Sequence, residues 1–156
     1  MVYCACLMRV PLDCLVPIPD DSKTTSGESK MIKRMPTHCG DETCPSCVVA
    51  GDFVFLAHHA GGFSSDDVVH QMEAAFDKLK STLESVGASL EDMVQINLFL
   101  RNIEDFRPAR DVFFKYFQDG FPARMALTTD FVDSACLCML DGIAYKKGIS
   151  DSGESG

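Results

Sequence analysis

One long amphipathic segment, with a strand-like segment on either side, constrains the fold of this sequence more than any other feature. Apolar residues recur at helical spacing from residue 68 to residue 86, and Gly87 follows them. The preceding residues 64–67, SSDD, offer hydroxyl and carboxylate groups that can cap the first turn of a helix. The pattern predicts an amphipathic helix of about 20 residues. Its apolar face consists of Val68, Met72, Ala75, Phe76, Leu79, Leu83 and Val86.

The segments on either side of this helix are predicted to be strands, one from its apolar composition and the other from its alternating pattern. DFVFLA, residues 52–57, is a short apolar run after Gly51, and MVQINLFL, residues 93–100, predicts the next strand. Asp105 can cap a second helix, with Pro108 tolerated in its first turn, and Gly120 closes that helix. Alternate residues of the segment 93–100 point to opposite faces. One face carries Val94, Ile96, Leu98 and Leu100, and the other carries Met93, Gln95, Asn97 and Phe99.

Three further segments complete the predicted sheet. Residues 124–129, RMALTT, and residues 135–146, ACLCMLDGIAYK, predict two strands, and residues 31–34 predict another near the start. This order predicts an α+β domain with a mixed sheet and two helices on one face. The other face still carries Leu137, Met139 and Ile143, so we expect copies of the chain to cover it in a homo-oligomer.

The domain boundaries follow from composition. Residues 31–148 form the predicted domain, and one domain is the expectation for 156 residues. Residues 1–30 form an N-terminal extension that ends in the polar segment DDSKTTSGESK and is expected to be partly disordered. Residues 149–156 form an acidic tail that is expected to be disordered.

The net charge excludes some partners. At a net charge of −9 with no dense basic stripe, the sequence predicts no nucleic-acid partner. No apolar run approaches the roughly 18 residues of a membrane span, so no membrane partner is expected. The first residues lack a basic segment ahead of their short apolar stretch and make a poor signal peptide. We therefore expect a cytoplasmic protein whose eight cysteines are thiols.

The cysteines offer a weak metal motif. Cys44 and Cys47, with His38 and Cys39 upstream, could supply soft ligands for zinc, but one isolated CxxC is rarely a structural zinc site. The sequence context of a redox CxxC is also missing. We therefore predict no metal and no cofactor. Cys136 and Cys138 are expected to pack on the helices as small hydrophobic residues.

Arg124, in the segment FPARMA, raises the question of function. Its guanidinium lies at the start of an apolar strand, and a cation there needs an anion. The residues alone leave two alternatives open, which are a ligand anion and an acidic side chain of a neighbouring subunit.

Four blocks of this sequence are similar to the reactive intermediate deaminase (Rid) family, whose members were formerly described as L-PSP endoribonucleases. The blocks are AGDFVFLAHHAGG, KSTLESVGASLEDMVQINLFLRNIEDF, FPAR and LCMLDGIAY, and the resemblance as a whole covers about residues 31–147. The resemblance implies a sandwich similar to chorismate mutase, a homotrimer, and ligand clefts between subunits. It also implies hydrolysis of enamines or imines to ammonia and 2-oxo acids, in which Arg124 would bind the substrate carboxylate.

The sequence departs from the family at the other polar site positions. Met139, fifteen residues after Arg124, replaces the glutamate that helps to activate water in deaminating members. Cys44 replaces a tyrosine, and Arg110 replaces the usual asparagine of the second helix. The Ser-Gly that usually ends the first core strand is Ala57-His58. Asp141 and His58 are the candidates for holding a water in place of the missing glutamate, against plainer structural roles for both.

The combined expectation is a protein that binds a small carboxylate metabolite through Arg124, with Asp141 as the second candidate catalytic residue. Deamination of 2-imino acids would be impaired by Met139, because losing a positioned general base removes about 10²–10⁴ in rate. The competing expectation is a non-catalytic trimer that acts as a metabolite sensor, a holdase-like protein or a scaffold. The acidic charge disfavours an endoribonuclease.

Overall fold

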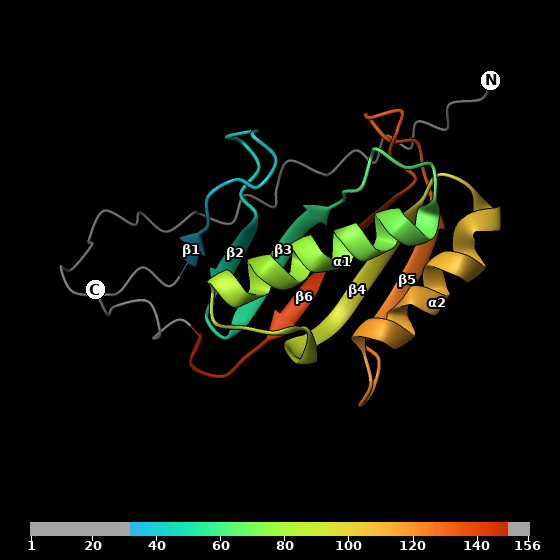
Figure 1. Ribbon diagram of the computed structural model, residues 1–156. Coiled ribbons are helices and arrows are strands. Elements are labelled where there is room, and N and C mark those ends of the chain that lie inside the picture. The colour runs from blue at the N-terminus through green and yellow to red at the C-terminus, as the bar shows by residue number, and fades with distance from the viewer. Residues whose placement is uncertain (1–31, 150–156) are drawn as a thin grey trace, which may run out of the picture.

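Two helices lie on one face of a six-stranded sheet in the computed structural model of this protein, which describes residues 32–149 (Figure 1). The fold is therefore α+β with a mixed sheet, as the sequence predicted. The elements are β1 (Ile32–Arg34), β2 (Cys47–Ala50), β3 (Phe53–His59), α1 (Val68–Ser85), the 3₁₀ turn η1 (Leu90–Asp92), β4 (Met93–Leu100), the 3₁₀ turn η2 (Ile103–Asp105), α2 (Phe106–Tyr116), β5 (Ala123–Thr128) and β6 (Cys138–Tyr145).

The sheet has the strand order β1-β2-β3-β6-β4-β5. Every neighbouring pair is antiparallel except β4 and β5, which run parallel. This single parallel pair follows from the connection, since α2 carries the chain back to the end at which β4 began. The arrangement leaves β5, the strand of Arg124, at one edge of the sheet.

Helix α1 begins and ends as the sequence predicted. The Asp67 carboxylate accepts a hydrogen bond of 3.0 Å from the backbone N–H of Val69, which satisfies one of the free donors of the first turn. The helix ends beside Gly87, whose φ of 80° lies in the left-handed region that ends many helices. The buried apolar face of α1 covers β3 and β6, and its fully buried Phe76 packs edge-on against Phe113 of α2.

Helix α2 is shorter than the sequence predicted. It begins at Phe106, directly after Asp105, with Pro108 in the first turn, but it ends at Tyr116 and not at Gly120. Phe117 adopts an extended conformation and is nevertheless buried against the core. The end of this helix is therefore set by packing of Phe117 and not by the glycine that follows.

The strand predicted over residues 52–57 is present as β3, but the strand before it was missed. The segment CVVA forms its own strand, β2, which pairs with β3 across the tight turn at Gly51 and Asp52. Gly51 has a φ of 59°, which only glycine adopts readily. The two strands form a hairpin of the most common short kind, and the Gly-Asp pair was the missed signal.

The predicted alternation of the next strand fails at its first two residues. A bulge lies between Met93 and Gln95 in the pairing of β4 with β6, so Met93 is buried at 6% exposure and Val94 is exposed at 47%. From Ile96 onward, the helix-facing residues are the predicted ones. The bulge meets Gly142 of β6, where an added Cβ would overlap the Gln95 carbonyl oxygen.

The face of the sheet opposite the helices is uncovered in the single chain, as predicted. Side chains of β3, β5 and β6 project from it, and the exposed apolar ones include Phe53, Phe55, Met125 and Tyr145. Three of these are aromatic neighbours, with ring centroids 5.2 Å apart for Phe53 and Tyr145 and 6.4 Å apart for Phe53 and Phe55. Such a patch is typical of a protein–protein contact surface.

The C-terminal boundary of the packed domain lies close to the predicted one. The N-terminal extension and the acidic tail lie outside the described residues, except for Ile149. Ile149 is buried in the core, so the packed part of the chain reaches one residue beyond the expected boundary at 148. Within residues 32–149, no helix is long and apolar enough to span a membrane.

Candidate functional site

Arg124 lies on the edge strand β5 with its guanidinium over two aromatic rings of α2. It pairs in register with Ile96 of β4, which is fully buried, so Arg124 is on the helix-facing side of the sheet. Its Cζ lies 5.5 Å from the ring centroid of Phe106 and 5.0 Å from that of Phe113. Cation–π contacts of this kind hold the guanidinium in place without neutralising its charge.

A pocket of about 250 Å³ adjoins this guanidinium. Its apolar wall includes Phe114 and Phe121, whose rings meet edge-on with centroids 5.4 Å apart. No carboxylate pairs with Arg124 anywhere in residues 32–149. The lining residues are Arg110, Phe113, Phe114, Phe121, Pro122 and Arg124. The structure therefore brings two of the predicted site residues, Arg110 and Arg124, to one apolar pocket.

Met139 and Asp141 lie on the other face of the sheet. They share one face of β6, as predicted, and their partners in β4 are Phe99 and Asn97. The Asn97 amide donates a hydrogen bond of 2.7 Å to the Asp141 carboxylate. Because Arg124 is on the helix-facing side, one chain does not bring Arg124 together with either residue.

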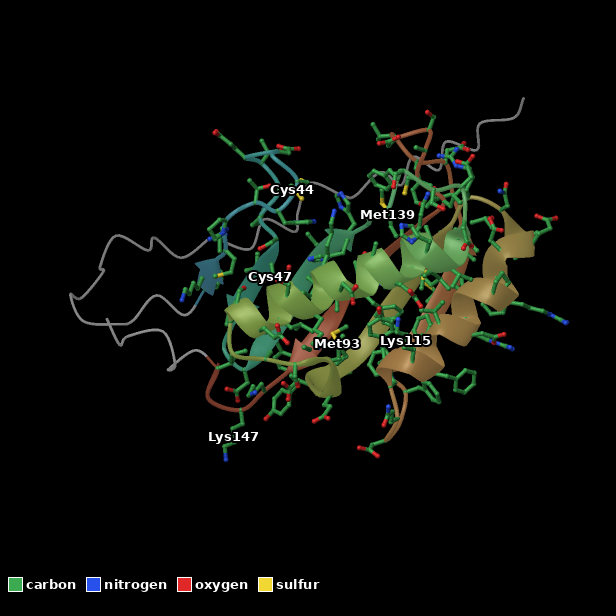
Figure 2. The ribbon with its side chains drawn as sticks, in the orientation of Figure 1. Cys44, Cys47, Met93, Lys115, Met139 and Lys147 are labelled. Carbon is green, nitrogen blue, oxygen red and sulfur yellow. The ribbon has the colours of Figure 1, made fainter. Side chains whose placement is uncertain are left out.

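The remaining predicted site residues gather where β3 ends. The backbone N–H of Ala57 donates to the Ser46 carbonyl, which ties β3 to the loop that carries Cys44. His58 is exposed, and its carbonyl accepts a hydrogen bond of 2.9 Å from His38. Figure 2 shows Cys44 and Met139 toward the same end of the sheet. None of these residues lines the Arg124 pocket.

His59 is a structural histidine that the sequence did not single out. It is completely buried, its Nδ1–H donates to the Ala57 carbonyl at 2.7 Å, and its Nε2 accepts from the Thr82 hydroxyl at 2.8 Å. His38 stacks on it with ring centroids 4.3 Å apart. Burial lowers the pKa of His59 from 6.5 to about 4, against the opposing effect of the Ala57 carbonyl. The structural, hydrogen-bonded role that the sequence suggested as an alternative for His58 belongs to His59 in the structure.

The two cysteines of the CxxC motif have different environments. Cys47 is buried in β2, on the face that packs against the core, whereas Cys44 lies half-buried in the preceding loop. Burial raises the pKa of both thiols, which disfavours the thiolates that bind metals. In the described part of the chain, no three His, Cys, Asp or Glu side chains are grouped to hold a metal ion.

Cys136 and Cys138 are fully buried toward the helices, as predicted. Burial raises the pKa of Cys138 to about 12, so this thiol stays protonated and inert. Both residues therefore act as small core side chains.

Comparison with known proteins identifies the family. The family model described as Endoribonuclease L-PSP matches residues 45–145. The chain belongs to this family, which includes the Rid proteins. A RutC family protein of Pyrococcus abyssi is 29% identical over 106 residues, which cover 64% of this chain and 84% of that protein.

Two further relatives agree with this family. The 2-iminobutanoate/2-iminopropanoate deaminase of Dermatophagoides farinae is 41% identical over 83 residues, 49% of this chain and 65% of that enzyme. Among solved structures, a hypothetical protein of the yjgF family from Streptococcus pyogenes has a TM-score of 0.68 at 28% identity, covering 76% of this chain and 98% of its own. The family thus includes imine deaminases alongside proteins described as endoribonucleases.

Proposed function

We propose that this Rid family protein binds a small carboxylate metabolite at Arg124 and hydrolyses 2-imino acids slowly. The observation that carries the proposal is the guanidinium of Arg124, which has no carboxylate partner in residues 32–149 and borders a pocket with an apolar wall. A guanidinium can bind a carboxylate through two parallel hydrogen bonds, each stronger than a neutral one. The Phe106 and Phe113 rings hold this group in place before the ligand arrives.

The proposed reaction is hydrolysis at the imine carbon. The oxygen of water adds to this carbon, one water proton ends on nitrogen, and the resulting carbinolamine loses ammonia as its C–N bond breaks. The hydroxyl proton leaves with the nitrogen, and the carbon is left as the carbonyl of a 2-oxo acid. Arg124 would hold the adjacent carboxylate, so the imine carbon keeps one position relative to the attacking water.

We propose further that the working site is completed by a second subunit in a homotrimer with a chorismate-mutase-like arrangement. Two observations support this. The face that carries Phe53, Phe55 and Met125 exposes these apolar side chains and is uncovered in the single chain. Arg124 and the water-holding candidate Asp141 lie on opposite faces of one sheet, so a shared site needs Asp141 from another copy. The exclusion of RNA and of membranes, and the cytoplasmic location, remain predictions from the sequence.

A non-catalytic trimer is the second candidate function, and Met139 favours it. The thioether cannot accept a proton from water, and Asp141 is already hydrogen-bonded to Asn97. A protein that retains the arginine and lacks the acid would bind the carboxylate without turning over the imine. Such a trimer would act as a sensor of the metabolite, as a holdase-like protein or as a scaffold.

Ammonia release from 2-iminopropanoate, generated in the assay mixture, separates the two functions. We expect weak activity above buffer for the wild type, none for Arg124→Ala, and a gain for Met139→Glu. Arg107→Ala is the matched control, because Arg107 is an exposed arginine of α2 that does not line the pocket. Rates equal to buffer in all variants would refute the deaminase and leave the binder.

A further inference from the structure

A second arginine lies beside Arg124 at the same pocket. Arg110 of α2 is four residues after Phe106 and three before Phe113, so helical spacing places it on the face that carries these two rings. These are the rings over which the Arg124 guanidinium lies. Arg110 and Arg124 both line the pocket of about 250 Å³.

The pocket lining contains two cations and no acidic side chain. In a chain with a net charge of −9, this is a local excess of positive charge. Two guanidiniums at one small pocket repel each other, and an anion that touches both relieves this repulsion. Water normally weakens the repulsion between two such charges. The apolar wall of Phe113, Phe114 and Phe121 excludes part of this water, so the repulsion is stronger here.

Arg110 has one partner in its own chain. Its Nε and Nη2 donate to a single carboxylate oxygen of Asp111, and in residues 32–149 no hydrogen bond engages its Nη1. The two side chains are 43% and 58% exposed, so this ion pair between neighbours contributes little to stability. Arg110 therefore retains donors for a ligand and can exchange Asp111 for one.

We propose that Arg110 selects ligands with a second carboxylate, so that the preferred substrates are 2-imino dicarboxylates of four or five carbons. Arg124 binds the carboxylate next to the imine carbon, and Arg110 binds the distal carboxylate. The aromatic wall contacts the methylene groups between them. This proposal rests on the proposed function, since Arg110 selects among ligands that Arg124 anchors.

Isothermal titration with two 2-oxo acids of equal length tests the proposal. 2-Oxoglutarate and 2-oxopentanoate differ only in the distal group, which is a carboxylate in the first and a methyl group in the second. We expect the wild type to bind 2-oxoglutarate about tenfold more tightly, the gain typical of one added charge-assisted contact. Arg110→Asn should reduce this ratio to about one, and Arg110→Lys should retain part of it.

Two further variants isolate the contribution of Arg110. Arg107→Asn removes the same charge from the same helix outside the pocket and should keep the wild-type ratio. Asp111→Asn removes the competing carboxylate and should tighten 2-oxoglutarate binding only. Circular dichroism of each variant confirms that the helix is intact.

The outcomes distinguish this inference from the proposed function. Equal affinities of the wild type for the two acids, with both lost in Arg124→Ala, would overturn the dicarboxylate preference and leave carboxylate binding intact. An equal loss of both acids in Arg110→Asn would also overturn it, because Arg110 would then add only general attraction. Binding of neither acid to the wild type would overturn both proposals.

Discussion

Acidification should destabilise this protein through His59 before its carboxylates are protonated. The His59 side chain is fully buried as the neutral tautomer that carries its proton on Nδ1, and its pKa is about 4 against an ordinary value of 6.5. Protonation would place a second proton on Nε2, which now accepts from the Thr82 hydroxyl. His38, His58 and Lys78 lie nearby, and their charges also disfavour a cation at this position.

The sign and size of the effect follow from the difference in pKa. Between pH 6.5 and pH 4 the unfolded chain binds this proton and the folded chain does not, so the free energy of unfolding falls as the pH falls. The contribution is fully present above pH 6.5. For these two pKa values the loss between pH 7.5 and pH 5 is about 2 kcal/mol, and the largest possible loss is about 3 kcal/mol.

Urea denaturation at fixed protein concentration measures this loss at pH 7.5 and at pH 5. We expect the wild type to lose about 2 kcal/mol more than His59→Gln does, since glutamine does not titrate. His70→Gln is the control, because His70 is exposed on α1 and its replacement should leave the pH dependence unchanged. A His59→Gln variant that loses as much stability as the wild type would refute the reasoning.

Three substitutions test the packing. Phe76→Ala should lower the free energy of unfolding by about 3–5 kcal/mol in urea denaturation, because the ring is fully buried and stacks on Tyr116 at 4.4 Å; a loss below about 1 kcal/mol would contradict this. Gly142→Ala should lower the melting temperature far more than Gly148→Ala, because only the first overlaps backbone atoms of β4, and equal losses would contradict it. Phe55→Glu places a charge on the uncovered face and should reduce the molecular mass of the oligomer measured by sedimentation. An unchanged mass would argue against this face as a subunit interface.

Periodic features of the sequence were sufficient to predict most of the fold. The apolar face of α1, with its Asp67 cap and the following Gly87, depends only on contacts within a few residues. The strands β5 and β6 also follow from local alternation and their flanking residues. The uncovered face of the sheet could then be deduced, because two helices cover one face only.

Features that depend on distant contacts were not predictable in this way. The bulge at Val94 lies against Gly142 of β6, which is distant in sequence, and nothing near Val94 indicates it. His58 and His59 are adjacent and chemically identical, and contacts with distant residues, Thr82 of α1 and His38, distinguish the structural one. Arg124 and Met139 lie on opposite faces of the sheet because of the register in which β5 and β6 pair with β4. The spacing of the two residues in the sequence does not reveal this register.

Titration of pyruvate, a 2-oxo acid, into the wild type, Arg124→Ala and Arg107→Ala tests the central claim most directly. If Arg124 is a ligand anchor, the wild type and Arg107→Ala bind pyruvate with the same affinity and Arg124→Ala binds at least tenfold more weakly. Equal binding by all three proteins, or a crystal in which a neighbouring subunit's carboxylate occupies the Arg124 guanidinium, would contradict the account.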